Sequence, residues 1–115
     1  MYEVGRPPLV ASTLINIKTM NRLIIQGCTL VRTCGACPEQ YDVYFGDFQI
    51  GYLRLRHGSF SASYPDYTGE TVFHAYPKGD GMFEDDERMS YLTQAVCSLL
   101  NHHNNKILEK WDYVD

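Results

Sequence analysis

The sequence has no apolar run that approaches the roughly 20 residues needed to cross a bilayer. Its N-terminus also lacks the basic start and the uninterrupted apolar segment of a secretion signal. We therefore expect a cytoplasmic protein that makes no membrane contact. In that compartment we expect the four cysteines, Cys28, Cys34, Cys37 and Cys97, to stay mostly reduced.

A concentrated basic face is also missing. The formal net charge is −4: residues 1–60 carry six Lys or Arg against four Asp or Glu, and residues 61–115 carry four against ten. Binding of duplex nucleic acid by charge alone requires a basic face, so this balance argues against such a partner. A small basic site for one anionic ligand stays possible.

One domain is the natural count for 115 residues. A chain of this size buries roughly 65% of the surface that its unfolded form exposes, which is enough for one core. We divide it into a variable N-terminal extension at 1–20, a β-sheet region at 21–83, a helix at 84–104 and a C-terminal tail at 105–115.

The sheet is predicted around residues 41–64, where alternation and turn residues coincide. In strand geometry, one side of the segment 48–57 shows Phe48, Ile50, Tyr52, Arg54 and Arg56, and the other shows Gln49, Gly51, Leu53, Leu55 and His57. Gly46-Asp47 and His57-Gly58 are typical of tight hairpin turns. Two hairpins that share one long central strand make a meander.

Further strands are expected at 23–33, with a bulge or a bend at Gly27, and at 71–76. Residues 85–103 carry an apolar stripe at helical spacing, with Asp85 as N-cap and an Asn- and His-rich end at 101–105. The fold class is therefore α+β, an antiparallel β-meander of about five strands packed by one C-terminal amphipathic helix. Its two exposed sheet edges favour a homodimer or a higher symmetric oligomer.

Two short motifs partly match known sites, one for a metal or redox dithiol and one for phosphate, but neither is complete. Cys34-Gly-Ala-Cys37 is half of a zinc site or a redox dithiol, and it lies between two predicted strands, where an incidental or structural role is the simplest interpretation. The segment 78–81 is a glycine-containing loop before a helix, but the acidic turn that follows argues against phosphate. We expect no enzyme, no catalytic residue, no metal and no cofactor.

The best candidate for a binding site is the pair Arg54 and Arg56, together with Tyr52, which alternation places on the same face of the strand. Arginines two apart on a strand share a face and can grip a phosphate, while aromatic rings offer stacking surfaces for a base. The predicted ligand-binding residues are Arg54, Arg56, Tyr52, Phe60, Tyr64, Lys78, Arg88 and Tyr91. In the competing interpretation, the two arginines pair with Asp42, Glu70 or the acidic helix start.

The runs CGACPEQYDVYFGDFQIGYLRLRHGSFSASYP, GETVF and GDGMFEDDERMSYLTQA resemble small proteins of unassigned function encoded in tailed-phage and prophage genomes. The resemblance covers roughly residues 26–100. Compact phage proteins of this size are often counter-defence factors, among them the Thoeris anti-defence and anti-CBASS sponges, which are oligomers that trap cyclic nucleotide signals between subunits. The resemblance implies this class and assigns no residue.

Two functions from different classes follow as hypotheses. The first is a non-catalytic sponge that sequesters a nucleotide-derived immune signal, of the cyclic nucleotide or cyclic ADP-ribose type, in the cytoplasm of an infected bacterial host. The alternative is an anti-CRISPR-like inhibitor that occupies a basic channel of a host defence effector with its acidic face at 84–87.

Overall fold

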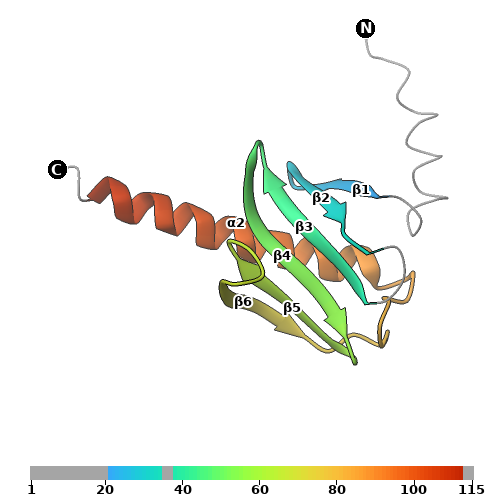
Figure 1. The fold of residues 1–115 in the computed structure, drawn as a ribbon. Coiled ribbons are helices and arrows are strands. Elements are labelled where there is room, and N and C mark those ends of the chain that lie inside the picture. The colour runs from blue at the N-terminus through green and yellow to red at the C-terminus, as the bar shows by residue number, and fades with distance from the viewer. Residues whose placement is uncertain (1–20, 35–37, 113–115) are drawn as a thin grey trace, which may run out of the picture.

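The computed structural model describes residues 21–34 and 38–112. Six strands form one antiparallel sheet in sequence order, and a single long helix follows them (Figure 1). The elements are β1 Arg22–Ile25, β2 Cys28–Arg32, β3 Glu39–Phe45, β4 Phe48–Arg56, β5 Ser59–Tyr64, β6 Glu70–Ala75 and α2 Arg88–Asp112. The α+β meander with a C-terminal helix is confirmed. The predicted extension at 1–20 lies outside the described residues.

The sheet has six strands rather than about five because the predicted strand at 23–33 is a hairpin. Gln26 and Gly27 both adopt positive φ, 53° and 79°, and Ile25 pairs with Cys28 across them. Two consecutive residues of positive φ make the turn whose twist suits a two-residue hairpin. The expected bulge or bend at Gly27 is thus a complete chain reversal.

The central strand β4 contains a bulge at Ile50. Val43 pairs with Gly51 and Tyr44 pairs with Gln49, so Ile50 is the extra residue between them. Ile50 lies in the core together with Leu53 and Leu55. The prediction that Ile50 lies on the same side of the strand as Arg54 assumed unbroken alternation and is therefore wrong. The bulge explains why neither face of this stretch is apolar along its whole length.

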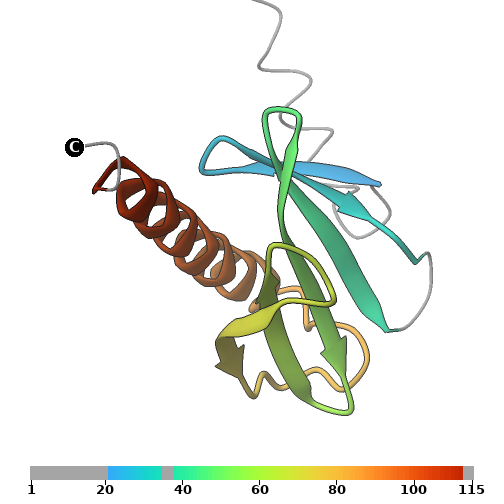
Figure 2. The same cartoon turned by 60° about the vertical axis from the view of Figure 1, so that its left-hand side comes forward.

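The helix α2 packs across one face of the sheet, and no other described element covers the opposite face, called here the open face (Figure 2). Gly51 lies directly beneath Leu99, and a Cβ at that position would collide with the Leu99 side chain. This close approach sets the depth at which the helix sits on the sheet. The buried apolar core comprises Leu23, Ile25, Cys28, Leu30, Tyr41, Val43, Ile50, Leu53, Leu55, Phe60, Ala62, Phe83, Leu92, Ala95, Val96 and Leu99.

The predicted helix end at 101–105 is wrong, because α2 continues to Asp112. Its last half projects beyond the sheet (Figure 1). Ile107 and Leu108 lie on this part with 40% and 61% of their surface exposed. Asparagine is only a weak helix breaker, and the turns on either side of the Asn-rich segment are helical. Within the described part of the chain, no helix is both long and apolar enough to cross a membrane.

Glu84 and Glu87 close a turn directly before the helix, which begins at Arg88. The Glu84 carbonyl accepts the amide of Arg88 at 3.1 Å, and the Glu87 carboxylate accepts the amide of Glu84 at 3.0 Å. Asp85, the expected N-cap, lies within this turn, and its carboxylate accepts a hydrogen bond from the Arg88 guanidinium.

Candidate functional site

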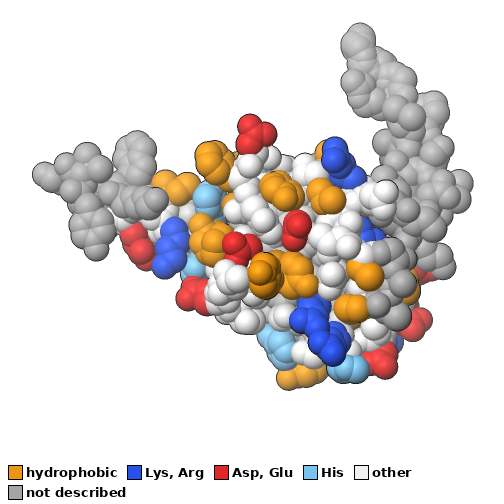
Figure 3. Space-filling model, viewed as in Figure 1, with side chains coloured by type: hydrophobic (Ala, Val, Ile, Leu, Met, Phe, Trp, Pro, Cys, Tyr) orange, Lys and Arg blue, Asp and Glu red, His pale blue; other side chains and the backbone are white. Residues whose placement is uncertain are grey.

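The open face of the sheet carries Tyr52, Arg54 and Arg56, which alternate outward along β4 beyond the bulge. Pairing with the neighbouring strands places Arg54 between Gln40 and Ser61. In Figure 3, which views this face, Lys and Arg side chains gather at the end of β4, with His side chains beside them. The basic group predicted from the sequence thus lies on the sheet face opposite α2.

Strand β5 contributes only small polar side chains to this face. Ser59 lies opposite Arg56, Ser61 opposite Arg54, and His74 on β6 lies opposite Ser61. The Ser59 hydroxyl and His74 Nε2 are 2.7 Å apart. The result is a shallow trough with a floor of serine hydroxyls and a wall of guanidinium groups. Its volume is about 330 Å³.

Both arginine side chains at the trough are without partners in the ranges 21–34 and 38–112. Among the residues that the structure describes, the Arg54 and Arg56 side chains form no ion pair and no hydrogen bond, although Arg54 Nε is buried. The arrangement therefore leaves strong donors unused next to an open trough.

The acids that could have neutralised these arginines are engaged elsewhere. Asp42 accepts a hydrogen bond from Gln49 Nε2 at 3.3 Å, and Glu70 Oε2 lies 2.8 Å from His102 Nε2. The helix start is occupied by Lys78 and Arg88. The competing interpretation, in which the arginines belong to surface ion pairs, does not describe this face.

An aromatic pair continues the site beyond Arg54. The rings of Tyr52 and Tyr67 meet edge to face with centroids 6.2 Å apart, and Tyr67 is 75% exposed. The Tyr52 hydroxyl donates to Gln40 Oε1 at 3.0 Å, which fixes the ring. Burial raises the pKa of Tyr52, while the positive charge of Arg54 acts against that rise. Tyr67 was not predicted, because loop residues between strands carry no periodic signal.

Phe60 and Tyr91 lie in or against the core rather than at the trough. Phe60 is fully buried, with its ring 4.9 Å from Phe83 and 6.4 Å from Tyr91. The prediction that Phe60 stacks on a ligand is wrong, because the inward side of β5 carries the aromatic residues and the outward side carries the serines. Tyr91 stacks on Phe83, with the ring planes 16° apart.

Tyr64 and Lys78 also lie apart from the arginines. The Tyr64 side chain points to the helix side of the sheet, where its hydroxyl is 2.8 Å from His103 Nδ1. Lys78 lies in the loop before α2 and pairs with Asp86 at 3.1 Å, with both side chains exposed. Of the eight predicted residues, the structure therefore brings together Tyr52, Arg54 and Arg56.

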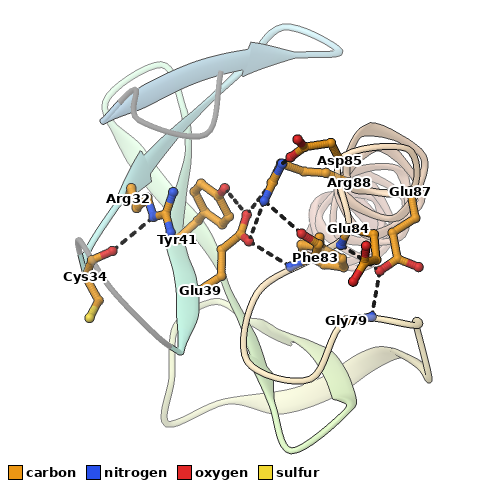
Figure 4. Close-up of polar contacts among 10 residues, drawn as sticks. All are labelled: Arg32, Cys34, Glu39, Tyr41, Gly79, Phe83, Glu84, Asp85, Glu87 and Arg88. Carbon is orange, nitrogen blue, oxygen red and sulfur yellow. Dashed lines mark hydrogen bonds and ion pairs between the residues drawn. The ribbon is translucent and has the colours of Figure 1, made fainter. Parts of the chain in front are cut away.

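Arg88 is the centre of a buried polar network instead of a ligand contact (Figure 4). Its guanidinium donates to both oxygens of Glu39 at 2.8 and 3.1 Å, to Asp85 at 2.8 Å and to the Phe83 carbonyl at 3.0 Å. Arg88 and Glu39 are each 1% exposed. Four of its five N–H donors are used within the chain, so Arg88 fixes the helix to β3 instead of facing a ligand.

The buried pair also controls the ionisation of its neighbours. Burial alone would raise the pKa of Glu39, but hydrogen bonds from Arg88, Tyr41 and the Phe83 amide lower it overall. Burial and the adjacent Glu39 raise the pKa of the Tyr41 hydroxyl. Sequence reasoning missed Glu39, although its signal was present: Glu39, Tyr41 and Val43 share the inward phase of β3.

Glu87 anchors the loop that leads to the helix. Its carboxylate accepts the backbone amides of Lys78 at 2.9 Å, Gly79 at 2.8 Å and Glu84 at 3.0 Å. Burial favours the neutral acid, but these three amides outweigh it and lower the pKa of Glu87. The acidic run at 84–87 therefore has a structural component that charge counting alone does not reveal.

The cysteines add no site in the described residues. Cys37 of the C-x-x-C motif lies outside them, so the motif as a unit is not described. Burial, and to a smaller extent the nearby Cys97, raise the pKa of the Cys28 thiol. Across 21–34 and 38–112, no three His, Cys, Asp or Glu side chains are grouped as metal ligands.

Comparison of the chain with protein-family models, with curated proteins and with solved structures finds no match. The candidate site therefore rests on its own geometry.

Proposed function

We propose that this protein is a non-catalytic binder that captures a nucleotide-derived signalling molecule on its open sheet face, in the cytoplasm of a phage-infected bacterium. The observation that carries the proposal is the pair Arg54 and Arg56, without partners among the described residues, beside a trough with a serine floor. Phosphate oxygens accept hydrogen bonds from guanidinium and hydroxyl groups in this arrangement.

The dimensions of the face suit a nucleotide. Tyr52 and Arg56 are four residues apart on one strand, a separation of roughly 13 Å. A phosphate held by Arg54 and Arg56 leaves the sugar over Ser61 and the base within reach of the exposed Tyr67 ring. Base stacking on an aromatic side chain contributes roughly 1–3 kcal/mol and does not depend strongly on the base.

A hydrolytic role is less well supported than binding. Ser59 and His74 have the separation of a nucleophile and its base. However, no carboxylate in the described part of the chain holds the second ring nitrogen of His74, and such a third group normally orients the base. We therefore assign both side chains to ligand contact, and unchanged ligand after prolonged incubation is the expected result.

The acidic face is also less well supported as a protein-binding surface. Glu87 is buried, Asp85 binds Arg88, and Asp86 pairs with Lys78. These contacts already give the acidic residues a structural role. Arg54 and Arg56 have no such contacts with the residues that the structure describes.

The experiment compares nucleotide capture by two variants of equal charge change. Native mass spectrometry and calorimetric titration with a panel of cyclic and linear nucleotides are applied to the wild type, to Arg54→Ala with Arg56→Ala, and to Arg22→Ala with Lys106→Ala as control. We expect binding to the wild type and the control, and a loss of at least about tenfold in the first variant, since one charged hydrogen bond contributes roughly 1.5–3 kcal/mol. Equal affinities for all three proteins would refute the proposal.

A further inference from the structure

A second depression adjoins the trough at the end of the sheet. It has a volume of about 320 Å³ and is lined by Pro38, Arg56, His57, Asp80 and Gly81. Arg56 and His57 also line the trough, so the two depressions share one wall. Each is near the lower end of the roughly 300–1,000 Å³ range typical of small-molecule sites.

The loop that forms the far wall of this pocket is held in place from several directions. The Glu39 amide donates to the Gly81 carbonyl and the Gly58 amide donates to the Asp80 carbonyl, each at 2.8 Å. Upstream, Glu87 binds the Gly79 amide. Downstream, Glu39 binds the amide of Phe83 at 3.0 Å. The buried carboxylates therefore preorganise the backbone on both sides of Asp80.

Asp80 has an exposed side chain, and its carboxylate has no hydrogen-bond or ion-pair partner in the part of the chain that the structure describes. It lines the same pocket as Arg56, yet the two do not form an ion pair. A carboxylate repels phosphate, and in hydrogen bonds it acts only as an acceptor. It therefore suits a ligand group that presents two adjacent N–H donors.

Guanine has such a group, because N1–H and the exocyclic N2 amino group lie side by side on one edge. The same edge of adenine has an acceptor at N1, which a carboxylate repels. Pro38 provides a flat apolar contact on the pocket wall, and Arg56 stands between this pocket and the serine floor. A phosphate at Arg56 and a base at Asp80 are thus compatible with one ligand.

We propose that the Asp80 pocket seats a guanine base, so that the ligand of the sheet face is a guanine nucleotide whose phosphate lies over Arg56. This inference rests on the proposed function, but it places the base in the Asp80 pocket at the Arg56 end of the face instead of at the Tyr67 ring, and it adds base selectivity. Asp80 is the specificity-determining residue, and the arginines supply affinity for any phosphate.

The test is a calorimetric titration with GMP, IMP, AMP and ribose 5-phosphate. IMP keeps N1–H and lacks the amino group, so the wild type should prefer GMP to IMP and IMP to AMP. We expect the affinity for GMP to be about tenfold higher than that for AMP, because a bidentate contact typically contributes roughly 1–3 kcal/mol of discrimination. Asp80→Asn should lower the affinity for GMP about tenfold and leave the affinity for AMP unchanged or slightly higher. Asp47→Asn, at the β3–β4 hairpin tip, is the control and should keep the preference.

The outcomes separate the inference from the function on which it rests. Equal affinities for GMP and AMP that both depend on Arg54 and Arg56 would overturn the guanine pocket and leave nucleotide capture standing. A GMP preference that survives Asp80→Asn would also overturn the role of Asp80. Failure of all four probes to bind at millimolar concentration would overturn both proposals. Thermal melting of each variant verifies that it is folded.

Discussion

Arginine occurs in two contrasting settings in this protein. Arg88 is 1% exposed and its guanidinium contacts Glu39, Asp85 and the Phe83 carbonyl. Arg54 and Arg56 lie on the open sheet face, and in the described residues their side chains have no partner. Removal of a charge from water is tolerated only when its hydrogen bonds are replaced. Arg88 meets this requirement within the chain, whereas Arg54 is only half-buried and Arg56 is exposed, so water can reach their guanidinium groups.

The largest expected effect is that of Arg88→Met. The substitution leaves Glu39 buried beside Tyr41 without its charged partner, and breaking such a buried pair typically costs about 3–5 kcal/mol of unfolding free energy. Urea denaturation measures this loss. The double variant Glu39→Gln with Arg88→Met should recover part of it. A single variant as stable as the wild type would contradict the role assigned to the network.

The next effect is that of Glu87→Gln. The amide group retains one acceptor oxygen and places an N–H group against the Gly79 and Glu84 amides, so the variant should lose about 1–3 kcal/mol of unfolding free energy. Hydrogen exchange should increase in the loop 77–83. Asp86→Asn is the matched control and should change stability by less than about 1 kcal/mol, since its pair with Lys78 is fully exposed. Equal effects in both variants would exclude a special role for Glu87.

Acid should destabilise the protein through Glu39. Its pKa is lowered in the folded state, so its contribution to stability is complete above the unfolded value of about 4.5 and is lost as the pH falls through the folded value. Each such group changes the unfolding free energy by at most about 1.4 kcal/mol per pH unit. Urea titrations between pH 3 and 6 should show a smaller slope for Glu39→Gln with Arg88→Met than for the wild type. Parallel slopes would mean that other groups dominate.

The smallest effect on stability is expected for Arg54→Ala with Arg56→Ala. Neither side chain has a partner among the described residues, so the unfolding free energy should change by no more than about 0.5 kcal/mol per substitution. Removal of the two like charges can even stabilise the sheet slightly. Urea denaturation beside Arg88→Met provides the comparison. A loss above 2 kcal/mol would show that the sheet-face arginines are structural after all.

The sequence predicted the meander because its turns carry local chemistry at Gly46-Asp47 and His57-Gly58. It predicted Tyr52, Arg54 and Arg56 on one face because alternation holds beyond the bulge. Ile50 was misplaced, since a bulge leaves no mark in a two-residue period. The helix end was misplaced because Asn-rich turns remain helical when flanked by helix formers.

The site was harder to predict than the fold. Phe60 was placed beside the arginines because the sequence does not show which side of β5 faces which side of β4. The pairing of β4 with β5 places Ser61 opposite Arg54, and this pairing brings the serines of the trough floor beside the arginines. Arg88 and Glu39 are 49 residues apart, and only the tertiary fold brings them together. The Asp80 pocket depends on the same contacts.

The most direct test of the contrast between the two kinds of arginine is an NMR titration of the Arg Nε–H resonances with GMP. We predict that the Arg54 and Arg56 signals shift in a saturable way and become protected from exchange with solvent, while the Arg88 signal, protected from the start, does not move. Shifts of all three signals, or of none, would contradict the account in which the sheet face is the binding surface.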